Sequence, residues 1–422
     1  MSGALVADLE AMLATIPVVD CHEHTFLPAA RPARVDMAAL FAGSDVADDL
    51  ISAGMPAAER PALTWATVEP YLDRVANTGF YRSLAAAFAA LFGYDGERLT
   101  EADWEALSAR LAAANARDDW YDTVLRDSAR IETVLRIQGG EPDPWAIPRR
   151  WFRAIARVDD WIVGAADRGT RERLAAEVGA AAGTLEAYLT ALDAWFDDLV
   201  RHEVVGIKSM LAYRRPLAHG RPDAAEAARL YGLPVRTPAE TAALEDALVH
   251  AVAERAGASG LPWQIHVGIG SWQSNIVANA DPLMLNPLVE AHRGTTFVLL
   301  HGGYPYIGEV ATMAKNHPNV VIECGWLAYI APSVHRRALG EWLDAVPASK
   351  ILAVGADCAY VEQTLGALIL TRHQLALVLA DRIRDSGWTP GLAESVARRL
   401  LGSNGRDLYR LAGDPEGGGR AR

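Results

Sequence analysis

Short apolar runs alternate with longer segments of helical periodicity along most of the chain. After a helical pattern at residues 4–14, eight apolar runs predict β-strands. These predicted strands span residues 16–20, 131–137, 152–158, 204–210, 263–267, 296–301, 320–323 and 351–354. The predicted helices lie near residues 184–201, 238–257, 282–292, 307–316, 333–345, 361–384 and 391–412. Alternation of this kind with eight strands predicts an α/β fold, a (β/α)8 TIM barrel built on parallel strands.

A long helical segment interrupts the alternation after the first strand. Residues 33–125 are rich in Ala, Leu and Trp and contain no convincing strand pattern. The segment is not low-complexity and carries many apolar residues, so it predicts a folded insertion rather than a linker. We expect a barrel from residues 1–32 and 126–412, a helical cap from 33–125 and a flexible tail at 413–422. Because loops that follow barrel strands lie on the catalytic face, the cap is expected to wall the pocket.

Composition excludes several classes of protein. The chain has 422 residues, of which 51% are hydrophobic and 22% charged, so it is not a disordered chain. The formal net charge of −13 argues against a nucleic-acid partner or an anionic membrane surface. No apolar run reaches the roughly 18 residues of a membrane span. We therefore expect a small-molecule substrate, and a homo-oligomer is compatible with this composition.

The cysteines and the N-terminus predict the compartment. Three cysteines without a CxxC pair indicate neither a disulfide framework nor a zinc ribbon. The first twenty residues include acidic residues and no basic segment, unlike a signal peptide. A reducing cytoplasm is the expected location.

Polar side chains stand at the carboxyl ends of six predicted strands, where a TIM barrel carries its active site. They are His22 and His24 on the first strand, Lys208 on the fourth, His266 on the fifth, His301 on the sixth, Glu323 on the seventh and Asp357 on the eighth. His22 and His24 are two residues apart in an extended segment, so both imidazoles point to one side. Imidazoles and a carboxylate brought to one end of a barrel predict a divalent metal site.

Two of these residues have more than one interpretation. Lys208 inside a barrel is costly unless it is paired or neutral. It could pair with an acidic residue at the rim, contact the substrate, or be carbamylated and bridge two metal ions. Glu323 could contact the substrate, or it could be the partner of Lys208 or of an arginine.

Three further residues are candidates for substrate binding. Arg214 and Arg215 follow the fourth strand and could clamp a carboxylate or phosphate, although such a pair is usually a surface feature. Tyr304 follows two glycines after His301 and could line the pocket or cover the barrel rim.

Several motifs together resemble the amidohydrolase superfamily, in particular its amidohydrolase-2 branch. They are VVDCHEH (18–24), GIK (206–208), WQIH (263–266), VLLHGGYP (298–305), AVGAD (353–357) and LLGSNGRDLYRL (400–411). Segments similar to these occur in the amidohydrolase-like domain of glutamine-synthetase fusion (nodulin-like) proteins, and uronate isomerases share the helical insertion. The resemblance covers nearly all of residues 15–412.

The resemblance implies a metal site and roles for its residues. His22, His24, His266 and Asp357 would bind one divalent metal, for which we expect Zn²⁺, with Mn²⁺ as the alternative. His301 would be a general acid/base, or with Lys208 it would hold a second ion; we favour one ion over two. A metal in such a site brings the pKa of bound water from 15.7 to about 7. Asp357 would then move the proton to the leaving nitrogen.

The expected function is hydrolysis of an amide or related C–N bond in a small polar substrate. Kinship with glutamine-synthetase fusions suggests a γ-glutamyl amide whose carboxylate is held by Arg214 or Arg215. A metal-dependent decarboxylase or uronate-type isomerase is the alternative, because the branch carries out these reactions on the same ligands.

Overall fold

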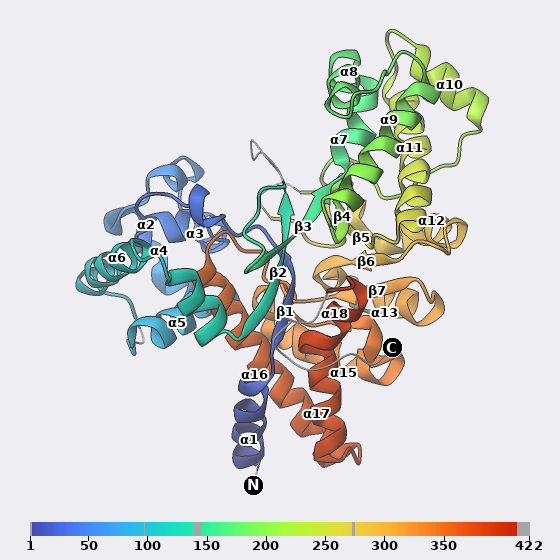
Figure 1. Ribbon diagram of the computed structural model, residues 1–422. Coiled ribbons are helices and arrows are strands. Elements are labelled where there is room, and N and C mark those ends of the chain that lie inside the picture. The colour runs from blue at the N-terminus through green and yellow to red at the C-terminus, as the bar shows by residue number, and fades with distance from the viewer. Residues whose placement is uncertain (1, 97, 139–144, 272–274, 412–422) are drawn as a thin grey trace.

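The computed structural model describes residues 2–96, 98–138, 145–271 and 275–411, so the predicted tail lies outside the described residues. Eight parallel strands form one sheet in the order β1-β2-β3-β4-β5-β6-β7-β8 (Figure 1). The strands are β1 (Val18–Glu23), β2 (Ile131–Gln138), β3 (Phe152–Arg157), β4 (Gly206–Ser209), β5 (Trp263–Ile265), β6 (Phe297–Leu299), β7 (Val320–Glu323) and β8 (Ile351–Leu352). Each predicted strand has its counterpart, and the predicted TIM barrel is confirmed.

Backbone hydrogen bonds between the first strand and the segment after the last strand close the sheet. The Cys21 N–H donates to the Val354 carbonyl at 2.9 Å, and the Asp357 N–H donates to the His22 carbonyl at 3.0 Å. The closure therefore brings the HxH segment and Asp357 together through the main chain.

Helices surround the barrel on several sides. The first group comprises α1 (Ser2–Thr15) and the insertion helices α2 (Met37–Ala42), α3 (Val46–Ser52), α4 (Trp65–Val75), α5 (Gly79–Phe92) and α6 (Glu101–Asn115). The second comprises α7 (Asp159–Val163), α8 (Arg168–Glu177), α9 (Leu185–Arg201), α10 (Ala224–Gly232) and α11 (Pro238–Ser259). The third comprises α12 (Asn286–Ala291), α13 (Ile307–Asn316), α14 (Leu327–Ile330), α15 (Pro332–Ala345), α16 (Val361–Asp385), α17 (Pro390–Arg398) and α18 (Asn404–Leu408).

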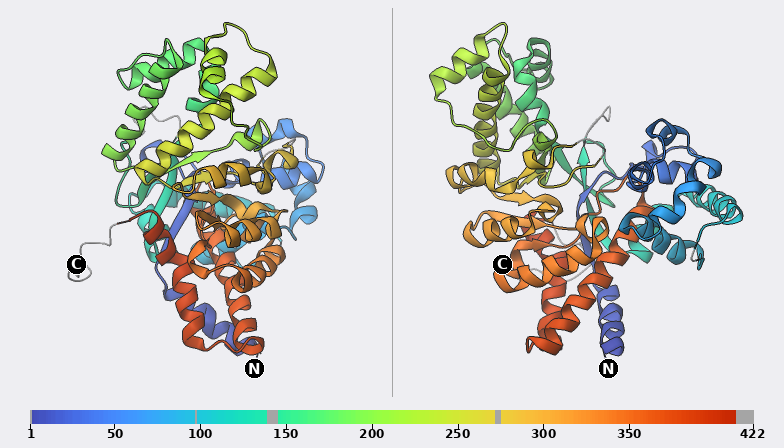
Figure 2. Two further views of the ribbon diagram at one scale, coloured as in Figure 1. Left: turned by 90° about the vertical axis from the view of Figure 1, so that its right-hand side faces the viewer. Right: turned by 180° about the vertical axis from the view of Figure 1, so that it is seen from behind.

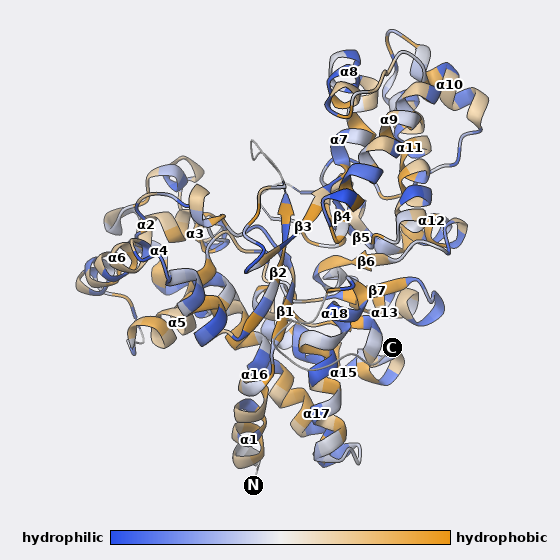
Figure 3. Cartoon of the chain, in the orientation of Figure 1, coloured by the Kyte–Doolittle hydropathy of each residue, from blue (hydrophilic) through white to orange (hydrophobic). Residues whose placement is uncertain are grey.

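Two groups of helices project from different sides of the barrel. The right-hand view of Figure 2 shows α2–α6, in blue to teal, well apart from α7–α11, in green to yellow. Most helices carry hydrophobic and hydrophilic residues side by side (Figure 3), as expected where one face covers the barrel. Among the described residues, no helix combines the length and the apolar composition that crossing a bilayer requires.

Helices α2–α6, which we call the cap, have a hydrophobic core of their own. Buried residues such as Leu40, Phe41, Val68 and Leu107 pack together there. Helices α4, α5 and α6 each begin at a threonine whose hydroxyl caps the first turn. Thr100, for example, forms a capping box with Asp103 at the start of α6.

One carboxylate binds the segments just before and just after the cap to the barrel. Glu362, in the first turn of α16, accepts from Arg31 at 2.6 Å and from the Trp120 indole N–H at 2.7 Å. Helix α5 also packs directly against α16. The cap is therefore fixed against the barrel helix that follows Asp357.

The interior of the barrel is apolar at one end and polar at the other. Apolar side chains from six strands pack with Tyr409, which follows α18: Val19, Cys21, Leu135, Ile137, Ile155, Val298, Leu300, Val321 and Leu352. The register of β1 against β2 shifts between Asp20 and Glu23. Val19 and Cys21 both join the apolar interior, as ordinary alternation along a strand expects. The irregularity falls at the next residue, His22, which lies in the polar end.

The close contact between the cap and α16 predicts how much stability is lost when one methyl group is added at Gly366. A Cβ built on Gly366 would lie 2.1 Å from the Ser83 carbonyl oxygen of α5. We expect Gly366→Ala to lower the free energy of unfolding by about 1–3 kcal/mol, because a backbone would have to move. Gly340→Ala in α15 is the control, since nothing lies within 4 Å of its added Cβ and it should gain about 0.5–1 kcal/mol. Urea titration measures both variants. If the two were equally stable, the result would contradict this packing.

Candidate metal centre and pocket

Three side chains from β1 and the loop after β8 meet at the polar end of the barrel. The Nε2 atoms of His22 and His24 lie 3.4 and 3.2 Å from Asp357 Oδ1. One ligand atom from each of the three residues lies within 4.8 Å of the others. Asp357 and His22 are therefore linked by a main-chain hydrogen bond and also lie side chain to side chain.

Gln264 of β5 fixes the orientation of His22. Its Oε1 lies 2.8 Å from His22 Nδ1, while its Nε2 donates to the Cys21 carbonyl at 2.7 Å and to the Tyr409 hydroxyl at 2.8 Å. Because the amide nitrogen has its acceptors, Oε1 accepts from Nδ1–H and the lone pair of His22 is on Nε2. Such a partner on the far nitrogen is typical of metal-ligating histidines.

His301 and His266 extend the cluster across β6 and β5. His301 Nε2 lies 3.8 Å from Asp357 Oδ2 and 3.0 Å from His266 Nδ1. The other ring nitrogen of His266 lies 3.0 Å from the Ile269 carbonyl. The structure therefore brings the predicted ligands into one network, in which His266 is reached through His301 and does not directly adjoin His22 and His24.

Two residues of this network have left-handed backbone. His301 has φ 63° and Asp357 has φ 53°, a region that non-glycine residues rarely adopt. Gly302 and Gly303 continue the left-handed turn with φ 61° and 64°. The two glycines thus allow the turn at His301 that follows β6.

Glu323 supports this turn. Its Oε2 accepts from the His301 N–H at 3.1 Å, and its Oε1 accepts from the Gly325 N–H. The side chain is fully buried, and burial raises its pKa to about 8. Glu323 therefore positions the backbone beneath the site, and the structure does not place it as a substrate contact.

The electrostatics keep the carboxylate ionised and the imidazoles neutral. Burial opposes ionisation of Asp357, but the adjacent imidazoles outweigh it and hold the pKa of this carboxyl well below its usual range. Burial lowers the pKa of His22, and it lowers that of His266 to about 3. Burial also lowers the pKa of Lys208 to about 8, against the attraction of Asp357. Neutral imidazole and ionised carboxylate are the protonation states that bind a metal.

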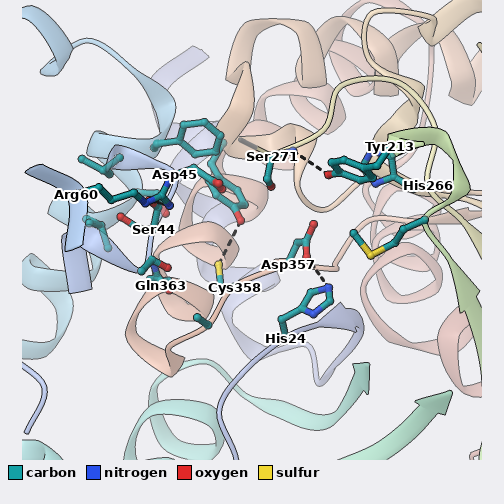
Figure 4. Close-up of a pocket in the computed structure, with 18 of the residues that line it drawn as sticks. His24, Ser44, Asp45, Arg60, Tyr213, His266, Ser271, Asp357, Cys358 and Gln363 are labelled. Carbon is teal, nitrogen blue, oxygen red and sulfur yellow. Dashed lines mark hydrogen bonds and ion pairs between the residues drawn. The ribbon is translucent and has the colours of Figure 1, made fainter. Parts of the chain in front are cut away.

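A pocket of about 320 Å³ opens above the cluster (Figure 4). Its volume suits a small ligand. The barrel contributes His24, Arg157, Lys208, Met210, Tyr213, His266, Ser271, Tyr329, Asp357, Cys358, Ala359 and Gln363 to its lining. The cap contributes Gly43, Ser44, Asp45, Val46, Arg60, Phe80, Ser83 and Leu84. The insertion therefore walls the same pocket as the strand ends.

Three predicted substrate-binding residues lie elsewhere. Arg215 pairs with Glu245 at 3.0 Å and Asp246 at 2.6 Å on α11. Arg214 is exposed, and Tyr304 is half-buried, with its carbonyl accepting from the Ile269 N–H. Among the described lining residues, the arginines are Arg60 and Arg157.

Two pocket residues were missed by reasoning from the sequence. Arg157 ends β3, one of two strands whose ends were left out of the search, so the strand-end rule could have found it. Asp45 lies in the cap just before α3, and its Oδ2 accepts from the Trp326 indole N–H at 3.1 Å. Its sequence neighbours carry no signal that it faces a barrel site.

The residues at the cluster fit a divalent metal ion. His22 Nε2 is buried without a hydrogen-bond partner, although its lone pair points toward Asp357. A buried polar atom in that state needs an explanation such as a missing ion. Two imidazoles and a carboxylate are ligands that zinc and related metals bind in catalytic sites. His22, His24 and Asp357 would hold the ion.

Comparison with known proteins agrees with a TIM-barrel enzyme that has a metal centre. The model of the Amidohydrolase family (Amidohydro_2) matches residues 19–411. The chain belongs to this family, so it is an enzyme of the amidohydrolase superfamily and its family implies a divalent metal.

Three similar proteins show how far the likeness extends. The protein fluG of Emericella nidulans is 29% identical over 237 residues, which are 52% of this chain and 27% of that protein. The chain thus matches about a quarter of the length of this curated relative. A glucuronate isomerase from Caulobacter crescentus has a TM-score of 0.81 at 18% identity, covering 98% of this chain and 95% of that one. A protein of Lactobacillus casei described as a metal-dependent hydrolase has a TM-score of 0.65 at 20% identity, covering 95% and 97%. These two structures share the fold.

Asp45 allows a prediction about stability and pH. Burial raises its pKa to about 7, whereas an unfolded Asp titrates near 3.9. Ionisation therefore costs the folded state stability as the pH rises through this interval. We expect Asp45→Asn to raise the free energy of unfolding of the metal-free protein by up to about 4 kcal/mol at pH 8 and by clearly less at pH 5. Urea titrations at the two pH values measure this difference, and an equal gain at both would contradict it.

Proposed function

We propose that the protein is a metal-dependent hydrolase that cleaves an amide or related C–N bond in a small polar substrate. The observation that carries this proposal is the orphaned Nε2 of the buried His22, which forms one cluster with His24 and Asp357, two residues that line the pocket. When bound there, a divalent ion acidifies water and polarises a carbonyl oxygen.

The residues around the cluster supply the remaining chemistry. Asp357 Oδ2 faces away from the His22 and His24 contacts and lies 3.8 Å from His301 Nε2. This oxygen can take a proton from the attacking water and pass it to the leaving nitrogen. His301, oriented by its contact with His266, is placed to bind the carbonyl oxygen or to exchange a proton with Asp357.

Lys208 and Arg157 are the cations that we assign to substrate binding. Lys208 is buried and lines the pocket, and Arg157 lies beside it on the neighbouring strand. They take the role that the sequence suggested for Arg214 and Arg215, which lie away from the pocket. A γ-glutamyl amide remains one candidate for the substrate.

We also propose that the site holds one Zn²⁺ and that Lys208 is not needed to hold it. The support is the ligand set: His22, His24 and Asp357 form one cluster, while His266 and His301 bond to each other. A reducing cytoplasm is the location we propose, because all three cysteines are free and buried.

The stoichiometry of zinc tests this assignment. We expect one zinc ion per chain in the wild type and in Lys208→Ala, and loss of the ion in His22→Ala, because the imidazole removed is a ligand. His373→Ala is the control, since this residue is exposed and pairs with Glu10. Elemental analysis after dialysis measures the content. Two ions in the wild type and fewer in Lys208→Ala would replace the assignment with a binuclear site bridged by this lysine.

Turnover of a mixed panel tests the reaction class. We expect the zinc-loaded protein to hydrolyse a compound among γ-glutamyl amides, N-acyl amino acids and dipeptides. Asp357→Asn should lower kcat by roughly 10²- to 10⁴-fold, because proton transfer is lost. Chromatography of the products measures the reaction. Isomerisation of a uronate, or carbon dioxide release from an aromatic acid, without hydrolysis of any amide would show that the alternative reaction is correct.

A further inference from the structure

We propose that the substrate is a zwitterion whose two charges flank the scissile bond, as in a dipeptide. Its ammonium group would bind Asp45, and its carboxylate would bind Arg157 and Lys208. This inference rests on the proposed hydrolysis of a C–N bond and adds the class of substrate.

The two cations lie on one side of the barrel mouth. Arg157 ends β3 and stands in register with Lys208 of β4. Lys208 is 1% exposed, whereas the Arg157 side chain is 47% exposed, and both line the pocket. The carboxylate of Asp159 is 4.0 Å from Arg157 Nε, at the limit of an ion pair. The Arg157 guanidinium can therefore form a closer pair with an anionic ligand.

Asp45 lies on the opposite side of the mouth. Its carboxylate accepts from Trp326, which comes soon after β7 in the chain. Strand β7 is four strands from β3 in a closed barrel of eight, so the two lie across the barrel from each other. Figure 4 shows Asp45 and His266 on different sides of Asp357, and all three line the pocket. The metal cluster thus has a cationic wall on one side and an acidic wall on the other.

The arginine of the cap does not neutralise Asp45 directly. Arg60 bonds through Nη1 to Asp48 at 2.8 Å, through Nε to the Ala42 carbonyl at 3.1 Å and through Nη2 to the Ser44 carbonyl at 3.4 Å. Among the described residues, the Trp326 indole is the hydrogen-bond donor to the Asp45 carboxylate. A carboxylate in this state needs a cation from a ligand to be stable in its ionised form.

A dipeptide matches this arrangement of charge. Two extended residues span about 7 Å, with an ammonium at one end, a carboxylate at the other and the amide between them. The scissile carbonyl would lie over the cluster while each terminus reaches its own wall. Hydrolysis adds water across the C–N bond: oxygen joins the carbonyl carbon, and a proton goes to the leaving amine. Two amino acids result.

Substrates with another charge pattern match less well. An N-acyl amino acid would leave Asp45 in the pocket without a cation, which costs free energy. A γ-glutamyl amide carries its ammonium and carboxylate on the same carbon, on one side of the scissile bond. In the pocket, by contrast, the partner groups for an ammonium and for a carboxylate lie on opposite sides of the cluster.

Three matched amides test the proposal. L-alanyl-L-alanine carries both charges, propionyl-L-alanine lacks only the ammonium, and L-alanine ethylamide lacks only the carboxylate. For the zinc-loaded wild type, we expect kcat/KM for the dipeptide to exceed that for either analogue by at least about tenfold, the factor that corresponds to 1.4 kcal/mol. Calorimetric titration of the metal-free protein, which does not turn the compounds over, should give the same order of affinity.

Two variants test which side chain binds the ammonium group and which binds the carboxylate of the dipeptide. Asp45→Asn should remove the preference for the dipeptide over propionyl-L-alanine, because kcat/KM for the dipeptide falls when its ammonium loses the carboxylate. Arg157→Met should remove the preference over the ethylamide. Asp49→Asn is the control, because this acidic residue lies on the same cap helix as Asp48 and does not line the pocket. It should keep both preferences.

The outcomes separate this inference from the proposed function. Equal turnover of propionyl-L-alanine and the dipeptide, or faster hydrolysis of a γ-glutamyl amide, would overturn the inference and leave the hydrolase assignment in place. If no amide is cleaved but the metal-free protein binds the dipeptide best and Asp45→Asn removes that preference, the recognition of a zwitterion stands and the hydrolase assignment fails.

Discussion

The carboxylate of Asp357, whose side chain is 14% exposed, is the group on which the arrangement of the barrel mouth depends. An ion removed from water costs several kcal/mol unless its surroundings compensate it. Here His22, His24 and His301 approach its two oxygens, and the main chain ties Asp357 to His22. The Tyr329 hydroxyl donates to the Ala356 carbonyl and so fixes the same loop. The lone pair of neutral His22 faces this carboxylate and does not compensate its negative charge, so a divalent cation is the natural complement of the set.

The backbone adopts unfavourable conformations at two residues of that cluster. Two non-glycine residues, His301 and Asp357, are held at positive φ, each at the end of a strand. Such conformations cost of order 1–3 kcal/mol and persist where their surroundings determine them. Glu323 is part of those surroundings, since its carboxylate accepts from the His301 N–H. Charged and polar side chains thus gather at one end of the barrel, while the apolar side chains around Tyr409 fill the other end.

The sequence predicts the barrel strands and the residues at their ends better than it predicts which other residues line the pocket. The strands could be predicted because parallel barrel strands are short apolar runs, and the meeting of His22, His24 and Asp357 could be predicted because strand ends converge in any such barrel. Gln264 lies within the WQIH motif, but its role depends on a contact with Tyr409, 145 residues away. Arg215 shows the opposite error: its position after β4 suggested the pocket, yet acidic side chains on α11 hold it outside. Position relative to a strand is thus a good guide for inward-facing residues and a poor one for loop residues.

The cap and the barrel divide the work of the site between them. The candidate metal ligands come from the end of β1 and the segment after β8, and the fold alone does not select among the reactions that such ligands support. Asp45 comes from the cap, and Trp326 links it to the barrel: its indole N–H bonds to Asp45, and its ring lies edge-on to His301 at 4.8 Å. A change in the cap can therefore alter which charge the pocket accepts while the ligands of the metal stay in place. Because Asp45 is costly to bury and bonds to no cation among the described residues, its presence is better explained by what it binds than by what it stabilises.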